Sequence, residues 1–421
     1  MTKKKTTEPS EAIPATPCAG TESEGQPLIL EQKFSVEFTY PVMFTRNVWS
    51  PSNPSLLTSL QRRGGTAPHK LLVFLDSGVD AAQPALQEEI RSYARAHADT
   101  LDLVQDPIVI PGGERIKNDM EGFRAMLHLL AGSGLCRHSF VVAMGGGAVL
   151  DAVGFATSLV HRGLRLIRIP TTVLAQNDAG IGVKNGLNTD SGKNTIGAFS
   201  PPFAVLNDFA VLRTLSDRDW IAGAAEAFKV AIIKDRKFFH SLIHDTPALR
   251  KRDPAAMERL IRRCAELHLD HIQSHGDPFE MGEARPLDFG HWSAHRLESL
   301  SCFRLLHGES VAIGIALDSA YAVRKGWISA KEFHAILTGL LDCGLPIWAD
   351  ELALRDPRGR RLIFDGLRSF REHLGGELCV TFPMGLGACR EERTIDLPVM
   401  ETCLEDLQAA AQRGIDDLFL D

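Results

Sequence analysis

Short apolar runs alternate with amphipathic stretches between Leu71 and Asp208, and this alternation restricts the possible folds more than any other feature. Four runs have the length and the branched residues of buried strands and are bounded by Gly, Pro or Asp: LLVFLD (71–76), FVVAMG (140–145), LRLIRI (164–169) and FAVLND (203–208). Two stretches between them, 85–98 and 119–134, space their apolar residues three to four apart, as helices do. Strands that alternate with helices predict βαβ units and therefore a parallel sheet.

The strand pattern nearly disappears after Thr214. Residues 255–272, 310–326 and 330–344 instead have the pattern of successive amphipathic helices. We therefore predict an α/β protein, with an N-terminal Rossmann-like parallel-sheet domain over 33–213 and a mainly α-helical domain over 214–421. Residues 1–32 are polar and contain no long apolar run, which predicts a disordered tail and not a secretory signal.

The size and charge of the chain exclude several classes of protein. Its 421 residues are too many for one compact core and suit two domains. It carries 46 Lys and Arg against 53 Asp and Glu, whereas partners such as nucleic acids or anionic membranes require a basic surface. No apolar stretch approaches the ~20 residues of a membrane span. The eight cysteines form no C-x-x-C pair, so we expect reduced, mostly buried thiols and a cytoplasmic location.

Three features fall at predicted strand ends, where open α/β sheets bind ligands. Gly145-Gly146-Gly147 joins a strand to a helix, and glycines there let backbone N–H groups approach a pyrophosphate. Residues 111–114 form a second turn whose carboxylate could bind a ribose hydroxyl, with Lys117 close behind, and Asp76 ends an earlier strand. A glycine turn without a ligand is about as common as one with a ligand, but three such features at one crevice predict a dinucleotide site.

A long Gly- and Asn-rich stretch between 171 and 199 has no clear helix or strand pattern. Loops of this length inside a domain are usually functional or disordered. Apolar residues at both of its ends favour an ordered loop over a solvated one. Its charged and amide residues, Asp178, Lys184, Lys193 and Asn194, could meet a phosphate group.

Carboxylate and imidazole residues in the helical part predict a metal site. Glu226 and Lys229 lie three residues apart in an otherwise apolar helix, where a simple salt bridge is the alternative. His291 and His295 share one helical face, and His307 begins a later apolar helix. One carboxylate and two neutral imidazoles suit Zn²⁺ or Co²⁺ with an open position. The spacing leaves open which two of the three histidines bind.

Taken together, these segments resemble the 3-dehydroquinate synthase family, the sugar phosphate cyclases. The segments are PGGERIKND (111–119), GGGAVLDAVGF (145–155), HRGLRLIRIPTTVLAQNDAGIGVKNGLN (161–188), SGKNTIGAFSPPFAVLND (191–208), LRTLSDRDWIAGAAEAFK (212–229), DFGHWSAH (288–295) and LLHGESVAIG (305–314). The resemblance covers residues 72–314 in the family's order.

The resemblance implies NAD, one divalent metal (Zn²⁺ or Co²⁺), a sugar phosphate substrate and a homodimer. NAD would be held by Asp76, Glu114, Lys117, Gly146, Gly147, Asp151, Thr171, Thr172 and Thr214, and the metal by Glu226, His291 and His307. The substrate would meet Arg162 of a partner subunit, Asp178, Lys184, Lys193, Asn194, His268, Asp288 and His295, and catalysis would use Lys184, Lys229, His295 and Asp178. The family reaction oxidises an alcohol transiently, eliminates phosphate, returns the hydride and closes a carbocycle by an aldol step, without net redox change.

The sequence departs from dehydroquinate synthases at substrate-facing positions. The family's E-L-K is Glu266-Leu267-His268 here, and its R-x-x-L-N-F-G-H begins at Ala284, with Arg285 one residue off and Asp288 in place of Asn. A D-K-K near the C-terminus is replaced around 370–373. Basic groups are lost and a carboxylate is gained, which disfavours a substrate carboxylate and suits sugar hydroxyls.

These changes predict sedoheptulose 7-phosphate as the substrate. In the resemblance, an Asp before F-G-H fits synthases of valiolone-type cyclitols, and the retained His295 argues against the 2-epi-5-epi branch, so we predict a 2-epi-valiolone-type synthase. The first alternative is 3-dehydroquinate synthase activity on 3-deoxy-arabino-heptulosonate 7-phosphate, with Arg285 or Arg371 replacing lost contacts. A metal- and NAD-dependent polyol dehydrogenase and a non-catalytic binding protein are further alternatives.

Overall fold

The structure is a computed structural model that describes residues 29–62, 64, 67–189, 192–274, 278–279, 286–373 and 376–415. The described residues from Thr39 onward form one compact unit, and those before Thr39 belong to a separate N-terminal unit without helix or strand. Most of the predicted disordered tail, 1–28, lies outside the described residues. The domain boundary at 213/214 also stays a prediction.

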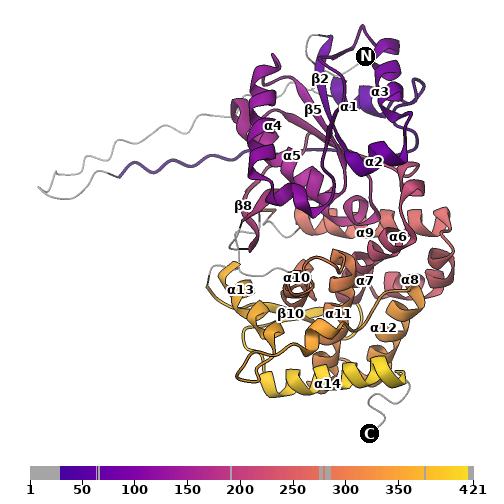
Figure 1. The fold of residues 1–421 in the computed structure, drawn as a ribbon, viewed down its shortest axis with the longest axis vertical. Helices are drawn as coiled ribbons and strands as arrows, with labels where there is room; N and C mark the ends of the chain where they lie inside the picture. Colours follow the sequence, from indigo (N-terminus) through magenta and orange to yellow (C-terminus); the bar gives the residue numbers. More distant parts are fainter. Residues whose placement is uncertain are drawn as a thin grey trace, which may run out of the picture. The chain divides into compact units, whose positions relative to one another are not determined.

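A parallel sheet organises the first half of the compact unit, as predicted. Among the described residues it has seven strands in the order β1-β9-β6-β5-β2-β3, with β4 also paired to β2 (Figure 1). The strands are β1 (Val42–Thr45), β2 (His69–Asp76), β3 (Leu101–Leu103), β4 (Ile108–Ile110), β5 (Phe140–Gly145), β6 (Arg165–Pro170) and β9 (Ala204–Asp208). The helical segments between them are α1 (Ser55–Gln61), α2 (Ser77–Ala82), α3 (Leu86–Ala96), η1 (Glu114–Asn118), α4 (Met120–Gly132), α5 (Gly147–Leu159), η2 (Val160–Arg162), η3 (Ala175–Ala179) and η4 (Val211–Thr214).

Both faces of this sheet are covered, which explains why its strands are continuous apolar runs. Leu72 and Phe74 of β2 point into one core, which they share with α4 and α5. The alternate residues Leu71, Val73 and Leu75 join a second core with α1, α3 and the helical half. The carboxyl ends of β2, β5, β6 and β9 therefore meet at one edge of a fixed scaffold.

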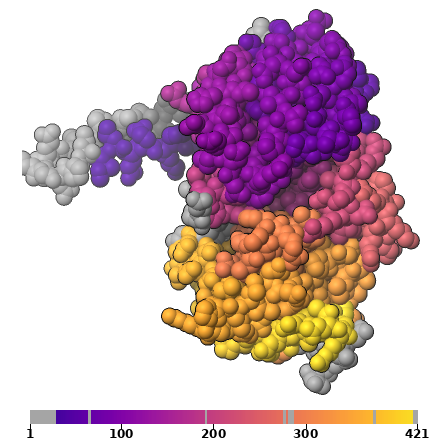
Figure 2. Space-filling model, viewed as in Figure 1, coloured from indigo at the N-terminus to yellow at the C-terminus, as the bar shows by residue number. Residues whose placement is uncertain are grey.

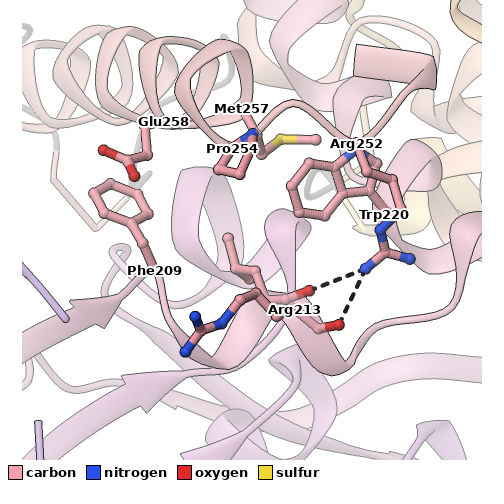
Figure 3. Close-up of a pocket in the computed structure, with 8 residues that line it drawn as sticks. Phe209, Arg213, Trp220, Arg252, Pro254, Met257 and Glu258 are labelled. Carbon is pink, nitrogen blue, oxygen red and sulfur yellow. Dashed lines mark hydrogen bonds between the residues drawn. The ribbon is translucent and has the colours of Figure 1, made fainter. Parts of the chain in front are cut away.

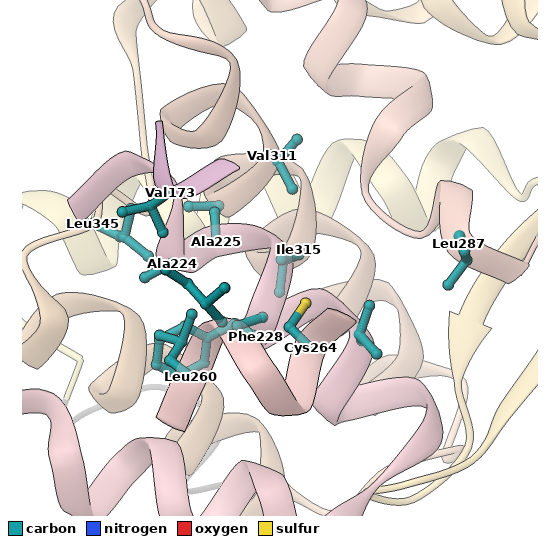
Figure 4. Packing of buried hydrophobic residues seen from close by; sticks show 14 of the residues in the cluster. Val173, Ala224, Ala225, Phe228, Leu260, Cys264, Leu287, Val311, Ile315 and Leu345 are labelled. Atoms are coloured by element: carbon teal, nitrogen blue, oxygen red, sulfur yellow. The ribbon is translucent and has the colours of Figure 1, made fainter. Parts of the chain in front are cut away.

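The second half is mainly helical, and α7 lies at its centre. Ten of the eleven residues of α7 are buried, and it packs against α8, α9 and α11. Figure 4 shows Ala224, Ala225 and Phe228 of α7 among apolar residues that include members of α9 and α11. The helical segments are α6 (Asp217–Ala222), α7 (Ala224–Lys234), α8 (Arg236–Arg250), α9 (Pro254–Ser274), η5 (Pro286–Asp288), α10 (His291–Leu300), α11 (His307–Arg324), α12 (Ala330–Cys343), η6 (Asp350–Ala353), η7 (Leu362–Phe364), α13 (Asp365–His373) and α14 (Leu397–Arg413).

Two hairpins differ from the sequence-based prediction. The stretch 171–199, predicted as a loop, contains the short helix η3 and the antiparallel pair β7 (Lys184–Thr189) and β8 (Gly192–Phe199). Gly186 and Gly197 face each other so closely that a Cβ on either would approach a backbone oxygen within 2.7 Å. Glycine has low strand propensity, but this close pairing of the two strands requires it here. A small pair, β10 (Val380–Pro383) with β11 (Cys389–Glu392), lies in the helical half.

The predicted state of the thiols is partly testable. Cys264, Cys343, Cys379 and Cys403 are buried and Cys389 is half-buried, whereas Cys136 and Cys302 are exposed; all seven are free. Within the described part of the chain, no helix combines the length and apolar character needed to cross a bilayer.

Candidate active site

The glycine-rich turn lies at the carboxyl edge of the sheet, next to Asp76. Gly146 and Gly147 begin α5, and Thr171 and Thr172 directly follow the neighbouring strand β6. A Cβ on Gly145 would lie 3.1 Å from the Asp76 Cβ, and one on Gly147 would lie 3.2 Å from the Ala179 Cβ. The turn is therefore packed closely between β2 and η3, and the N-terminus of the 13-residue α5 can receive an anion.

A buried lysine joins three of the predicted cofactor and substrate residues. Lys117 is 4% exposed, and its Nζ donates to Asp151 Oδ2 at 2.8 Å and to Asn194 Oδ1. Burial alone would lower the pKa of Lys117, but the carboxylates of Asp151 and Glu114 outweigh it and raise the pKa. The ammonium group therefore stays charged and links η1, α5 and the β7–β8 hairpin.

The hairpin is tied to the same place by its own polar residues. Asn188 donates to Glu114 Oε1 at 2.9 Å and accepts from the backbone N–H of Asn194 at 2.9 Å. Lys193 Nζ lies 3.5 Å from Glu114 Oε1 and also contacts Glu298 of α10. Glu114, Lys117, Asp151, Lys193 and Asn194, predicted from separate motifs, thus form one connected network.

Glu226, His291 and His307 meet in the helical half and form a candidate metal site. One ligand atom of each lies within 4.8 Å of the others. The Nε2 atoms of His291 and His307 lie 3.6 Å and 3.3 Å from Glu226 Oε1. His291 Nδ1 bonds to the Phe289 carbonyl at 3.0 Å, and His307 Nδ1 bonds to Glu298 Oε1 at 2.6 Å. Both second nitrogens are therefore occupied, which turns both Nε2 atoms toward Glu226, as in metal-ligating histidines.

The carboxylate of Glu226 fits a cation. It is completely buried, and among the described residues neither of its oxygens has a hydrogen bond of acceptable geometry, although Lys229 Nζ lies 2.5 Å from Oε2. Burial would raise the pKa of Glu226, but Lys229 and the histidines outweigh it and lower the pKa to about 2. Lys229 compensates the charge at Oε2, whereas Oε1 faces the two imidazole nitrogens, so a second cation could bind at Oε1. One carboxylate and two imidazoles are donors that suit Zn²⁺ or Co²⁺.

Asp178, His268 and Lys229 form a second cluster next to Glu226. His268 Nδ1 donates to Asp178 Oδ1 at 2.9 Å, and Lys229 Nζ lies 3.8 Å from the same oxygen. Burial would raise the pKa of Asp178, but Lys229 and His268 outweigh it and hold the pKa far below its usual range. The negative charge of Asp288 acts to raise the pKa of both Lys229 and His291, so Asp288 lies near this cluster.

His295 lies one helical turn after His291, and its ring centre is 5.4 Å from that of His291 and 5.9 Å from that of His307. Burial and the neighbouring imidazoles outweigh Glu298 and lower the pKa of His295 to about 3. His295 is therefore neutral at physiological pH.

Several predicted residues are not part of these clusters. Arg162 is exposed in a turn where His161 and Arg162 both have positive φ (52° and 60°), and Thr214 is exposed at the end of η4. Lys184 begins β7 and is exposed. Ala284 and Arg285 lie outside the described residues, and Arg371 is exposed on α13.

Three further polar residues hold the site and were not predicted from the sequence. Arg168 is fully buried in β6 and donates to the carbonyls of Gly180, Gly182 and Lys184 and to Asn185 Oδ1. Asp318 of α11 accepts from Gly290 N–H at 3.0 Å and Trp292 Nε1 at 2.8 Å, which fixes the start of α10. Glu298 contacts His307 and Lys193. Only Glu298 had a signal, because it follows His291 by seven residues and His295 by three on one helical face.

A separate cavity lies next to η4 and the start of α9. Phe209, Trp220 and Met257 line it, and Arg252 donates to the carbonyls of Leu212 and Arg213 at its rim (Figure 3). None of the predicted site residues lines this cavity. The clusters described above come instead from both halves of the compact unit, and Figure 2 shows one face hollowed where these halves meet.

The chain is similar to known proteins over most of its length. Residues 107–222 match the model of the 3-dehydroquinate synthase N-terminal domain, and residues 223–359 match that of the C-terminal domain. A 3-dehydroquinate synthase of Paracoccus denitrificans is 38% identical over 283 residues, 66% of this chain and 74% of the relative. A 2-epi-5-epi-valiolone synthase of Streptomyces glaucescens is 33% identical over 377 residues, 89% of this chain and 92% of the relative.

A solved structure extends the similarity to the fold. It is the 2-epi-5-epi-valiolone synthase ValA of Streptomyces hygroscopicus subsp. jinggangensis, with NAD⁺ and Zn²⁺ bound. Its TM-score is 0.80 at 28% identity, covering 90% of this chain and 99% of that one. Both family models and a relative of nearly full length thus match the chain that carries these clusters, and the chain belongs to the 3-dehydroquinate synthase family of sugar phosphate cyclases.

Proposed function

We propose that the enzyme is a C7-cyclitol synthase, which eliminates phosphate from sedoheptulose 7-phosphate and closes the remaining chain into a carbocycle of the 2-epi-valiolone type. The observation that carries this proposal is the His268–Asp178 pair, with its 2.9 Å hydrogen bond. His268 stands where the resemblance expects a lysine that faces the substrate. Its Nδ1–H donates to Asp178, so this donor is not available to a substrate carboxylate.

The charges around this pair point the same way. Lys229 is the main positive charge that acts on Asp178 and Glu226, and the negative charge of Asp288 acts on Lys229 as well. A substrate carboxylate would add a further negative charge in a buried place, where repulsion is poorly screened. A hydroxyl-bearing end can instead donate hydrogen bonds to these carboxylates. Sedoheptulose 7-phosphate has such an end, and 3-deoxy-arabino-heptulosonate 7-phosphate does not.

Lysines and amides supply the phosphate end of the proposed site. Lys193 and Asn194 lie on β8, and Lys184 begins β7. Asn194 is fixed by Lys117 and Asn188, so its place is set before a substrate arrives. We propose that these hairpin residues bind the phosphate as point charges and hydrogen-bond donors.

We propose NAD and one divalent metal as the cofactors, because the similar ValA enzyme has NAD⁺ and Zn²⁺ bound. The carboxyl edge with Asp76, Gly146 and Gly147 would hold NAD, which supplies a hydride acceptor and then a donor. Glu226, His291 and His307 would hold the metal, which supplies Lewis-acid polarisation of a substrate oxygen.

The protein's own groups have defined tasks in this scheme. Neutral His295 can form a hydrogen bond with a substrate oxygen beside the metal ligands. The Lys229 ammonium, held between Glu226 and Asp178, keeps both carboxylates ionised and can donate to a substrate oxygen. Asp178, oriented by His268, can accept from a sugar hydroxyl.

We further propose that the enzyme is cytoplasmic, since the free thiols fit a reducing compartment. We also propose that it is a homodimer, as the family resemblance implies. The exposed Arg162 would then reach the site of a partner subunit. A dimer by analytical ultracentrifugation, with activity restored when inactive Arg162→Ala and Glu226→Ala chains are mixed, supports this arrangement. A monomer with full activity overturns it.

The test of the proposed function is phosphate release from sedoheptulose 7-phosphate and, in parallel, from 3-deoxy-arabino-heptulosonate 7-phosphate, with NAD⁺ and Zn²⁺ or Co²⁺. Release from the first compound alone supports the proposal, and NMR of the product then separates 2-epi-valiolone from the 2-epi-5-epi isomer for which the Streptomyces relative is named. Release from the second alone makes the enzyme a 3-dehydroquinate synthase. Net NADH formation from a polyol makes it a dehydrogenase.

A further inference from the structure

Glu298 joins the two halves of the site, and none of the tasks proposed above uses it. We propose that it is a positioning residue, which orients the metal-ligand candidate His307 and at the same time holds the β7–β8 hairpin through Lys193. This inference rests on the proposed metal site of Glu226, His291 and His307.

The contact with His307 sets the direction of its ring. Glu298 Oε1 accepts from His307 Nδ1 at 2.6 Å, and His307 Nε2 then lies 3.3 Å from Glu226 Oε1. A carboxylate accepts only, so the proton is on Nδ1 and the lone pair of a neutral ring is on Nε2. This is the carboxylate–histidine–metal arrangement, in which the outer carboxylate fixes the tautomer and raises the basicity of the ligand.

The second oxygen of Glu298 holds a group from the other half of the protein. Its Oε2 accepts from Lys193 Nζ, and Lys193 comes from β8, 105 positions earlier in the chain. The Phe303 ring lies 5.7 Å from the same ammonium group and covers it. Both partners are thus held by one carboxylate that is 2% exposed, where a charge-assisted hydrogen bond is strong.

Backbone hydrogen bonds hold Glu298 in place independently of His307 and Lys193. Its carbonyl accepts from Phe303 N–H at 2.8 Å and from Ser301 Oγ at 3.1 Å. Cys302 and Phe303 adopt positive φ angles of 50° and 60°, which non-glycine residues rarely do. This strained turn directly follows Glu298 and lies next to the site, and strained backbone is common at functional sites.

The same geometry argues against a second metal at this place. His295, Glu298 and His307 also offer three ligand atoms within 4.8 Å. However, Lys193 already neutralises Glu298 Oε2, and His307 Nδ1 already donates to Oε1. A second ion would have to displace the ammonium and the imidazole proton, so we assign Glu298 to positioning.

Titration with Co²⁺ alone tests the His307 part without a substrate. We expect Glu298→Ala and the isosteric Glu298→Gln to weaken Co²⁺ binding about 10- to 100-fold, the usual cost of losing an outer-shell partner, and to change the visible Co²⁺ spectrum. Glu401→Ala is the matched control, because Glu401 also pairs with a buried cation, Arg361, but on α14. Its Co²⁺ affinity should equal that of the wild type.

Hydrogen exchange tests the Lys193 part. Amides of 184–189 and 192–199 should exchange faster in Glu298→Ala than in the wild type, and those of α14 should not. Unchanged Co²⁺ affinity in both Glu298 variants overturns the His307 role, and unchanged hairpin exchange overturns the Lys193 role. Glu226→Ala separates this failure from that of the proposed function: if Glu226→Ala still binds Co²⁺ as the wild type does, the metal site itself is wrong.

Discussion

The two halves of the site solve the problem of buried charge in opposite ways. On the sheet side, Lys117 donates to both Asp151 and Asn194, so the buried charges are paired within the protein. On the helical side, the buried carboxylate of Glu226 pairs with Lys229 through Oε2, and two imidazole nitrogens face its Oε1. The sheet side therefore pairs its charges within the protein, whereas the proposed metal ion would join the helical side at Glu226 Oε1, which no ammonium group in the described part of the chain occupies.

This difference follows from how each half is built. The sheet-side residues follow strand ends and sit in short motifs, so the parallel sheet brings them to one edge. The helical-side residues come from α7, α9, α10 and α11, which meet only through packing, with α9 and α11 against α7 and α10 against α11. A site assembled from four helices can hold groups that would repel or stay unsatisfied in isolation, because the apolar core fixes them.

The largest effect should come from Glu226→Ala. Loss of the metal removes a Lewis-acid contribution of several kcal/mol, so we expect turnover to fall at least ~10³-fold while NAD binding is kept. Phosphate release and NAD titration measure the two quantities. Full activity in this variant would contradict the metal assignment.

Metal affinity should depend steeply on pH. Burial would lower the pKa of His307, but Glu298 and Glu226 outweigh it and raise the pKa to about 9 without metal. A proton must then leave before Nε2 can bind, so Co²⁺ affinity should rise about tenfold per pH unit from pH 6.5 toward 9 and then level off. A flat profile by isothermal titration over this interval would show that His307 is not a ligand.

Lys117→Met should damage the sheet side alone. Removing one partner of a buried ion pair leaves Asp151 uncompensated, so the free energy of unfolding should fall by about 3 kcal/mol. NAD binding should weaken, and Co²⁺ affinity should be unchanged. Chemical denaturation and the two titrations check this, and an equal loss of Co²⁺ affinity would mean that the halves are not independent in this respect.

The smallest effect concerns substrate choice. His268→Lys combined with Asp288→Asn adds a positive charge and removes a negative one near Asp178. We expect the ratio of kcat/KM values to shift about tenfold or more toward 3-deoxy-arabino-heptulosonate 7-phosphate, because a partly buried ion pair contributes more than the ~1 kcal/mol of an exposed one. Lys325→Met, on the far end of α11, is a charge-changing control that should leave the ratio as it is.

The sequence predicted the parts of this molecule that depend on local pattern. The strands predicted at 71–76 and 140–145 are confirmed, and their pattern was clear because both faces of each strand are apolar. The helices predicted at 255–272 and 310–326 are also confirmed, because apolar residues recur along each at helical spacing. The β7–β8 hairpin was missed, since its Gly and Asn residues have low strand propensity and are ordered by the distant Arg168.

The same distinction between local and distant contacts applies to the site. The choice among His291, His295 and His307 could not come from spacing, because it depends on which nitrogens Phe289 and Glu298 occupy. The resemblance chose His291 and His307, the two whose Nε2 atoms face Glu226. Asp318 and Arg168 left no local signal, since each acts on backbone groups remote in sequence.

The contrast between the two halves can be tested by locating the metal in crystals grown with Zn²⁺, using anomalous diffraction at the zinc edge. We expect one strong peak among Glu226, His291 and His307, with Lys193 still on Glu298 and no ion near Lys117. A peak among His295, Glu298 and His307, or none in the helical half, would show that a cation does not complete the helical side in the way described.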